Sequence, residues 1–147
     1  MKSLIIFFGL LSIGLAKEPT PGNDLQQINA LVHAFVQGAD ERNVQQMDKV
    51  LHPEFRAVVN RLMGSEELSL MTKNLYLDLL KKGSIGGDKR TVYIEAIQIE
   101  NNNAVVRATF KGEKLVFNTF LQLVKAADGQ WSIISDMPHI AKVNSMQ

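Results

Sequence analysis

Apolar residues change their spacing along this chain, from helical in the first half to alternating in the last third. Between residues 28 and 39 they recur every three or four positions, which is typical of one buried helix face. Asp24 is a good N-cap because its carboxylate can accept a hydrogen bond from the amide of Gln27. The apolar stripe consists of Ile28, Leu31, Val32, Phe35, Val36 and Ala39. We therefore predict a first helix that starts at Asp24 and covers a sheet.

A second helix is expected after the break at residues 38–43. Asn43 can cap it, and His52-Pro53 ends it because the residue before proline avoids the helical conformation. The apolar residues that share one face of this helix are Val44, Met47, Val50 and Leu51. Residues 55–62 then predict a first strand.

The segment after that strand has two interpretations. Gly64-Ser65 can turn the chain into a short return strand through Leu68, or a third helix can begin at Ser65. We favour Ser69 as the helix cap, with the helix ending before Gly83. Its expected stripe then contains Met71, Thr72, Leu75, Tyr76 and Leu79.

Residues 91–137 predict four strands in succession. Val92, Ile94, Ile97 and Ile99 alternate with polar residues, but the phase slips near Glu95-Ala96, which indicates a bulge. Asp128-Gly129-Gln130-Trp131 leads into the last strand. Helices first and strands last predict an α+β fold, with three N-terminal helices packed on a curved, mostly antiparallel sheet. Such a cone-shaped domain has a pocket between sheet and helices.

The N-terminus is interpreted as a signal peptide over residues 1–16. Lys2 precedes an apolar run of about twelve residues, shorter than the roughly twenty that span a bilayer, and the run ends in Gly14-Leu15-Ala16. An uncleaved anchor is the alternative. Residues 17–23 read as a disordered tail and residues 24–147 as one domain. The expected location is periplasmic or secreted, with no membrane attachment after cleavage.

The composition of the chain limits the classes of partner and cofactor that we expect. Without Lys2, the 16 basic residues become 15 against 15 acidic ones, and a neutral chain is not expected to bind nucleic acid. The chain has no cysteine, so neither disulfides nor thiol ligands are expected. The histidines His33 and His52 share no metal-binding spacing with His139, and His33 reads as a surface residue. We therefore expect no metal and no cofactor.

Residues 115–124 are apolar on both alternating faces. Leu115, Phe117, Leu121 and Leu123 form one face, and Val116, Phe120 and Val124 form the other. One face is expected to meet the helices. The other predicts a homodimer through the outer face of the sheet. The alternative is that residues 140–147 fold back over it.

The chain resembles the nuclear transport factor 2-like superfamily. The resemblance lies in the order of elements, in residues 51–55 (Leu-His-Pro-Glu-Phe) and in residues 128–133 (Asp-Gly-Gln-Trp-Ser-Ile). Within it, the chain is most similar to the bacterial group known as putative lumazine-binding proteins, over residues 24–140. The resemblance implies a cone-shaped fold and a ligand, on a scaffold that serves enzymes, binding modules and assembly domains alike.

Catalytic candidates are few. Superfamily dehydratases and cyclases resemble this chain in fold and favour His/Asp pairs, and Asp136 with His139 is the comparable local set. If Trp131 and Ile133 face the core, strand alternation turns Ser135 inward and Asp136 outward, which separates the pair.

A binding pocket is the favoured hypothesis, with a small apolar or heteroaromatic ligand. An enzyme with a hidden acid–base pair and a dimeric partner-binding domain with a filled core are the alternatives. Six residues are expected to touch the ligand: Tyr76, Asn118, Asn60, Arg61, Tyr93 and Ser135.

Overall fold

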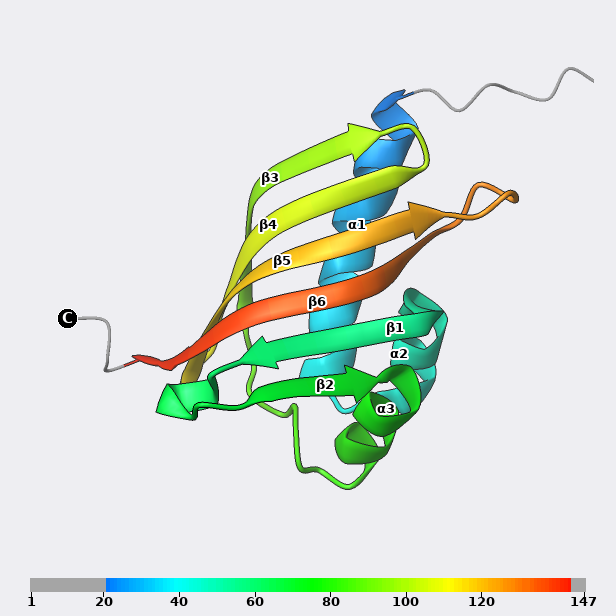
Figure 1. Cartoon of the computed structure of the whole chain (residues 1–147). Helices are drawn as coiled ribbons and strands as arrows, with labels where there is room; N and C mark the ends of the chain where they lie inside the picture. The colour runs from blue at the N-terminus through cyan, green and yellow to red at the C-terminus, as the bar shows by residue number, and fades with distance from the viewer. Residues whose placement is uncertain (1–20, 144–147) are drawn as a thin grey trace, which may run out of the picture.

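The structure, a computed structural model, describes residues 21–143 of the chain. The expected signal peptide and residues 17–20 of the expected tail lie outside this range. Three helices and six strands follow one another as the sequence predicted, which confirms the α+β class (Figure 1). They are α1 (Pro21–Asp40), α2 (Val44–Val50), β1 (Leu51–Asn60), η1 (Leu62–Gly64), β2 (Leu68–Thr72), α3 (Lys73–Lys81), β3 (Thr91–Glu100), β4 (Asn103–Lys111), β5 (Leu115–Lys125) and β6 (Trp131–Lys142).

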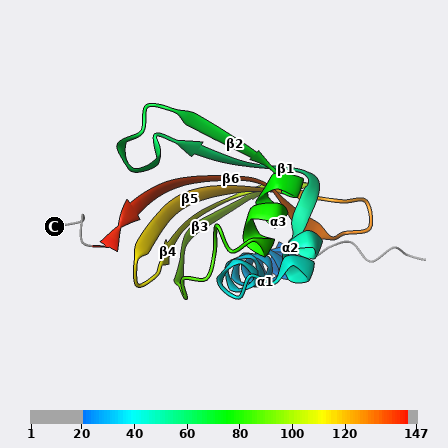
Figure 2. The same ribbon diagram turned by 90° about the horizontal axis from the view of Figure 1, so that it is seen from below.

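The strands form one curved sheet in the order β2-β1-β6-β5-β4-β3. All neighbours are antiparallel except β1 and β6, which run parallel. The three helices lie on the same face of this sheet (Figure 2). The predicted bulge in β3 is confirmed, because the register between β3 and β4 shifts between Ile94 and Ala96. No helix within residues 21–143 is long and apolar enough to cross a membrane.

Helix α1 buries the predicted apolar stripe, but it begins before the predicted cap. Its first residue is Pro21, so residues 21–23 are helical rather than part of a tail. Asp24 is buried inside the first turn, where its carboxylate accepts hydrogen bonds from Trp131 Nε1 at 3.0 Å and Lys125 Nζ at 2.9 Å. Asp24 therefore fixes α1 to the start of β6 instead of capping the helix.

The segment between α2 and α3 differs from its prediction. Strand β1 starts at Leu51, directly after α2, so His52 lies within a strand. The return strand after Gly64-Ser65 is present, but as residues 68–72, which pair with β1 as strand β2. Thr72 rather than Ser69 caps α3 by accepting a hydrogen bond from the amide of Leu75 at 3.3 Å. Pairing of the backbone with β1 outweighed the helical spacing of these side chains. Helix α3 buries Leu80 and leaves Leu75 exposed, so the predicted stripe was out of phase.

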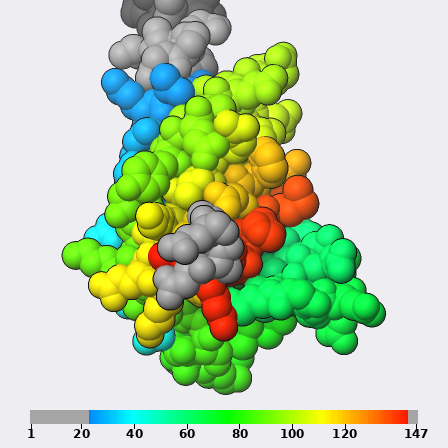
Figure 3. All heavy atoms as spheres, turned by 90° about the vertical axis from the view of Figure 1, so that its left-hand side faces the viewer, coloured from blue at the N-terminus to red at the C-terminus, as the bar shows by residue number. Residues whose placement is uncertain are grey.

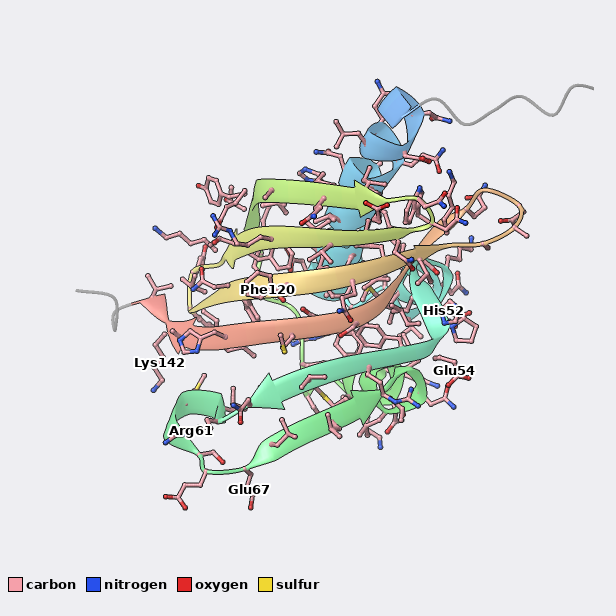
Figure 4. All side chains as sticks on the ribbon, turned by 45° about the horizontal axis from the view of Figure 1, so that its top comes forward. His52, Glu54, Arg61, Glu67, Phe120 and Lys142 are labelled. Atoms are coloured by element: carbon pink, nitrogen blue, oxygen red, sulfur yellow. The ribbon has the colours of Figure 1, made fainter. Side chains whose placement is uncertain are left out.

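The β1–β2 hairpin separates from the rest of the sheet at its tip. The last residues paired between β1 and β6 are Ala57 and Asp136. Beyond them the hairpin projects away from β6 (Figure 2), and Figure 3 shows its green tip beside the red end of β6. Arg61 and Glu67 lie at this tip (Figure 4), where the amide of Arg61 donates to the carbonyl of Glu67 at 3.0 Å. The sheet is therefore open between β1 and β6 at the end where the hairpin tip and the end of β6 lie.

Candidate ligand-binding pocket

A cavity of about 290 Å³ lies between the sheet, helices α1 and α3, and the loop that follows α3. This loop joins α3 to β3 and contributes Ser84, Ile85, Gly86, Asp88 and Arg90 to the wall. Most of the lining is apolar. The apolar lining residues are Phe35, Ala39, Ala57, Val59, Leu62, Met63, Met71, Ile85, Phe110, Leu115, Phe117, Pro138 and Ile140. The polar side chains with charged or hydroxyl groups in the wall are Tyr76, Ser84, Asp88, Arg90 and Asp136.

A bulge in β6 turns Asp136 into this cavity. Leu123 of β5 pairs with Ile133, but its neighbour Gln122 pairs with Ser135, so Ile134 is an extra residue in β6. An extra residue reverses the alternation of all later side chains. The predicted orientation was therefore wrong: Asp136 faces inward, and Ser135 lies on the outer face.

One of the two oxygens of the Asp136 carboxyl group accepts a hydrogen bond. Thr119 Oγ1 donates to Asp136 Oδ1 at 2.5 Å, and both residues are buried. Among residues 21–143 every fully enclosed side-chain nitrogen or oxygen has a hydrogen-bond partner. Since Oδ2 has none, it must be reached from the cavity. Burial raises the pKa of Asp136 to about 6, against the opposing effects of the Thr119 hydrogen bond and the Arg90 charge.

Tyr76 brings a hydroxyl group to the same space from α3. Its ring stacks on Phe35 with centroids 6.5 Å apart and meets Phe55 edge-on at 5.6 Å. Burial, followed by the nearby Asp136 charge, raises the pKa of Tyr76 above its ordinary range. The phenol therefore stays neutral and can donate a hydrogen bond to a ligand.

Arg90 is the cation of the wall, and its charge is already balanced. Its Nε donates to Asp40 Oδ1 at 2.6 Å, and its backbone amide donates to Asp40 Oδ2 at 2.8 Å. The guanidinium carbon lies 5.7 Å from the ring centre of Phe110 and 4.9 Å from that of Phe117. Both side chains of the ion pair are about nine-tenths buried. Arg90 is thus fixed between α1 and two aromatic rings.

The loop that carries these residues is held at several points. Arg42 donates hydrogen bonds to the carbonyls of Gly83, Ile85 and Gly86. Gly86 has a φ of +72°, and a Cβ there would collide with the carbonyl of Ala39. A glycine is therefore required for the loop to pass this close to α1.

Asp88 ties the far end of the loop to the β4–β5 turn. Its carboxylate accepts hydrogen bonds from the backbone amides of Glu113, Lys114 and Leu115, each at 3.2 Å. These contacts make the wall a preformed surface.

Of the residues proposed from sequence to touch a ligand, the structure places Tyr76 in the cavity wall. The others lie elsewhere because strand alternation sends them to the outer face or because they sit at the hairpin tip. Asn118 lies on the outer face and binds Thr109 Oγ1 at 2.9 Å. The remaining four, which are absent from the wall, are Asn60, Arg61, Tyr93 and Ser135.

The histidine of the candidate acid–base pair is separated from its partner. His139 is exposed on the outer face, where it pairs with Asn118, while Asp136 faces the cavity. Sequence reasoning also missed Asp88 and Arg90. The sequence feature that could have identified them is their position between the glycine-rich loop at residues 83–87 and the half-buried strand that follows it. Residues 21–143 contain no group of three or more side chains suited to hold a metal ion.

Several solved structures share this fold at low sequence identity. A nuclear transport factor 2-like protein of unknown function from Silicibacter pomeroyi DSS-3 is 15% identical, with a TM-score of 0.73, covering 84% of this chain and 100% of its own. A second nuclear transport factor 2-like protein of unknown function, from Shewanella baltica OS155, is 15% identical, with a TM-score of 0.72. The match covers 84% of this chain and 98% of that protein. A protein of unknown function with a cystatin-like fold, from Nostoc punctiforme PCC 73102, is 13% identical, with a TM-score of 0.66. The match covers 83% of this chain and 93% of that protein.

The comparisons with sequences give one family. No curated protein matches the chain. Residues 23–139, most of the described structure, match the family described as putative lumazine-binding. The chain therefore belongs to the putative lumazine-binding family and has the nuclear transport factor 2-like fold that its residues predicted.

Proposed function

We propose that this protein is exported and binds a small, ring-containing molecule in the cavity between sheet and helices. The wall is mostly apolar, and a few polar groups point inward, which is the usual design of small-molecule sites. The family description favours the same class of function. A cavity of about 290 Å³ argues against the alternative of a partner-binding domain with a filled core.

The observation that carries the proposal is the buried carboxyl group of Asp136. A carboxyl group with a raised pKa is costly to keep inside a fold at neutral pH. Thr119 satisfies one of its oxygens and leaves the other turned to the cavity. Such groups cluster at functional sites, where they meet a ligand.

The proposal is tested by thermal shift against a panel of ring-containing metabolites, with a variant that fills the cavity. Ile140→Trp adds an indole to the wall, whereas Leu25→Trp adds one to the exposed surface of α1. A compound that raises the Tm of the wild type and of Leu25→Trp, but not of Ile140→Trp, identifies the cavity as the site. If no compound separates these two variants, the cavity is not a binding site.

Acid–base catalysis by Asp136 is the second candidate function. A carboxyl group with a pKa of about 6 suits proton transfer near neutral pH, and the neutral phenol of Tyr76 can donate to a developing negative charge. Its test is deuterium exchange at the α-carbon of a small cyclic ketone in heavy water, followed by NMR. Exchange above background with the wild type but not with Asp136→Asn supports catalysis, and background exchange with both rejects it for this substrate class.

We also propose that the protein forms a homodimer through the outer face of the sheet. Phe120 of β5 is 48% exposed there (Figure 4), and its cross-strand neighbour Met137 is 50% exposed. Each large apolar side chain left in water forgoes roughly 1.5–3 kcal/mol of burial. Of the other two predicted interface residues, Val116 is buried within the chain and Val124 is half-buried, so the proposal now rests on Phe120 and its neighbours. Three more exposed apolar residues of this face are Tyr93, Val105 and Leu70.

Analytical ultracentrifugation at micromolar concentration tests the dimer. Phe120→Glu is expected to sediment as a monomer. Leu75→Glu, which changes a similarly exposed leucine on α3, is expected to remain a dimer. A wild-type protein that sediments as a monomer at high concentration would contradict this interface.

Export is tested separately, by N-terminal sequencing of protein recovered from the cell envelope or medium. Cleavage after Ala16 would leave Lys17 as the first residue. Intact Met1 on protein recovered from the cytosol would contradict export.

A further inference from the structure

Carboxyl groups outnumber cations around the cavity, and they differ in how completely neighbouring groups neutralise them. The carboxyl groups of Asp88 and Asp136 and the guanidinium group of Arg90 line the cavity, and Asp40 is bound to Arg90. Arg90 and Asp40 neutralise each other at 2.6 Å. Asp88 spreads its charge over three backbone amides of the β4–β5 turn. Asp136 is the charge that remains, because a neutral threonine hydroxyl is its hydrogen-bond partner within the described chain.

We propose that the ligand is a protonated amine attached to an aromatic ring, with the ammonium group bound to Asp136 Oδ2 and the ring lying against Tyr76 and Phe35. This inference rests on the proposed function and specifies its ligand class. An ammonium group matches the free carboxylate oxygen in charge and in hydrogen-bonding capacity. The lining also contains Phe110 and Phe117, so aromatic faces surround the space that the ring would fill.

An anionic ligand does not fit this wall. The guanidinium group of Arg90 is the natural partner of an anion, but Asp40 binds its Nε and Phe110 and Phe117 lie near it. An anion would also approach the carboxylates of Asp88 and Asp136 in a poorly solvated space, where like charges repel strongly. The wall therefore discriminates against anions by repulsion as well as favouring cations by attraction.

A cation also relieves the cost that Asp136 imposes on the fold. Within the described residues the carboxylate has a hydrogen-bond partner on one oxygen, and a bound ammonium group would supply a partner for the other. The other charged or titratable side chains in the described cavity wall are Arg90 and Asp88 from the loop after α3 and Tyr76 from α3. Asp40, from the end of α1, is bound to Arg90, and Asp88 is bound to backbone amides. Arg90 and Asp40 are a matched pair and Tyr76 is neutral, so ligand binding is expected to follow the ionisation of Asp136.

Three indole probes of nearly equal shape test the charge preference by isothermal titration calorimetry. Tryptamine carries an ammonium group, tryptophol a hydroxyl group and indole-3-acetate a carboxylate. At about pH 8 tryptamine should bind at least about tenfold more tightly than tryptophol, a difference of about 1.4 kcal/mol. Indole-3-acetate should bind most weakly. Tryptamine affinity should fall between about pH 8 and about pH 5, as Asp136 takes up a proton while the alkylamine stays charged.

Two variants assign the effect to Asp136. Asp136→Asn should remove the advantage of tryptamine and leave tryptophol affinity within about twofold of wild type, a change of about 0.4 kcal/mol. Asp78→Asn, which changes an exposed carboxylate on α3 paired with Lys82, should leave all three affinities unchanged.

Each failure has its own meaning. If tryptophol or indole-3-acetate binds as tightly as tryptamine, the amine proposal is overturned while a binding pocket stands. If none of the three probes binds, the amine proposal is likewise overturned, and the metabolite panel with Ile140→Trp still decides whether the cavity binds any ligand.

Discussion

Replacing Asp136 with asparagine should make the protein more stable at neutral pH. The side chain keeps its shape, and the amide oxygen can still accept the hydrogen bond from Thr119. What disappears is the cost of an ionised carboxylate in a buried wall. Most polar-to-polar changes at buried positions destabilise proteins, so an increase in stability is a distinctive result.

The size of the effect follows from the pKa of Asp136, which rises from 3.8 to about 6 on folding. Below the ordinary value of 3.8 the carboxyl is protonated in both states and costs nothing. As the pH rises towards 6, the unfolded chain loses this proton while the folded chain retains it, so the wild type loses stability through this window. A rise of about two pKa units corresponds to a loss of about 3 kcal/mol in the free energy of unfolding at pH 7. This is an upper value, because the folded protein relaxes around the buried charge and reduces its cost.

Urea unfolding of wild type and Asp136→Asn, followed by circular dichroism from about pH 4 to about pH 8, measures this difference. The two free energies of unfolding should nearly coincide at the acid end and diverge as the pH rises, with the variant more stable. Thr119→Val, which removes the hydrogen bond to Asp136, should change stability in the opposite direction. A variant that is less stable than wild type at neutral pH, with a gap that does not change with pH, would refute the account of Asp136.

Two further changes test the contacts that hold the two ends of α1 to the rest of the fold. Asp24→Ala should lower the free energy of unfolding by about 3–5 kcal/mol, because it leaves the buried ammonium group of Lys125 without a carboxylate partner. The hydrogen bonds from Lys125 and Trp131 lower the pKa of Asp24. The stability that Asp24 contributes should therefore be present at neutral pH and be lost as the pH falls through that lowered pKa. An acid titration by circular dichroism that is the same with and without Asp24 would contradict this. Gly86→Ala should lower the Tm more than Gly129→Ala. Both glycines have positive φ, at a cost of about 1–3 kcal/mol, but an added Cβ would meet α1 at Gly86 and open space at Gly129; equal losses in calorimetry would show that contact with α1 is not tight.

The spacing of side chains was sufficient to predict the architecture of this chain. Local sequence patterns, which depend on neighbours a few residues apart, predicted three features. Periodicity predicted the buried stripe of α1 and the bulge of β3, and residue type predicted the Asn43 cap of α2. The family resemblance rested on the same order of elements. Tyr76 was also identified from sequence, although it lies on an α3 whose buried face is not the predicted one.

Three features depended on contacts between distant parts of the chain. The turn at Gly64-Ser65 predicted a return strand only as far as Leu68, and residues 69–72 became part of that strand, rather than of a helix, because β1 offered backbone partners. Asp24 became an anchor because Lys125 and Trp131, about a hundred residues later, meet it at the end of the sheet. The bulge at Ile134 exists only in the pairing of β5 with β6, and one extra residue there decided which face Asp136 occupies. Periodicity therefore predicted where the strands run, but the register between strands determined which carboxyl group enters the pocket.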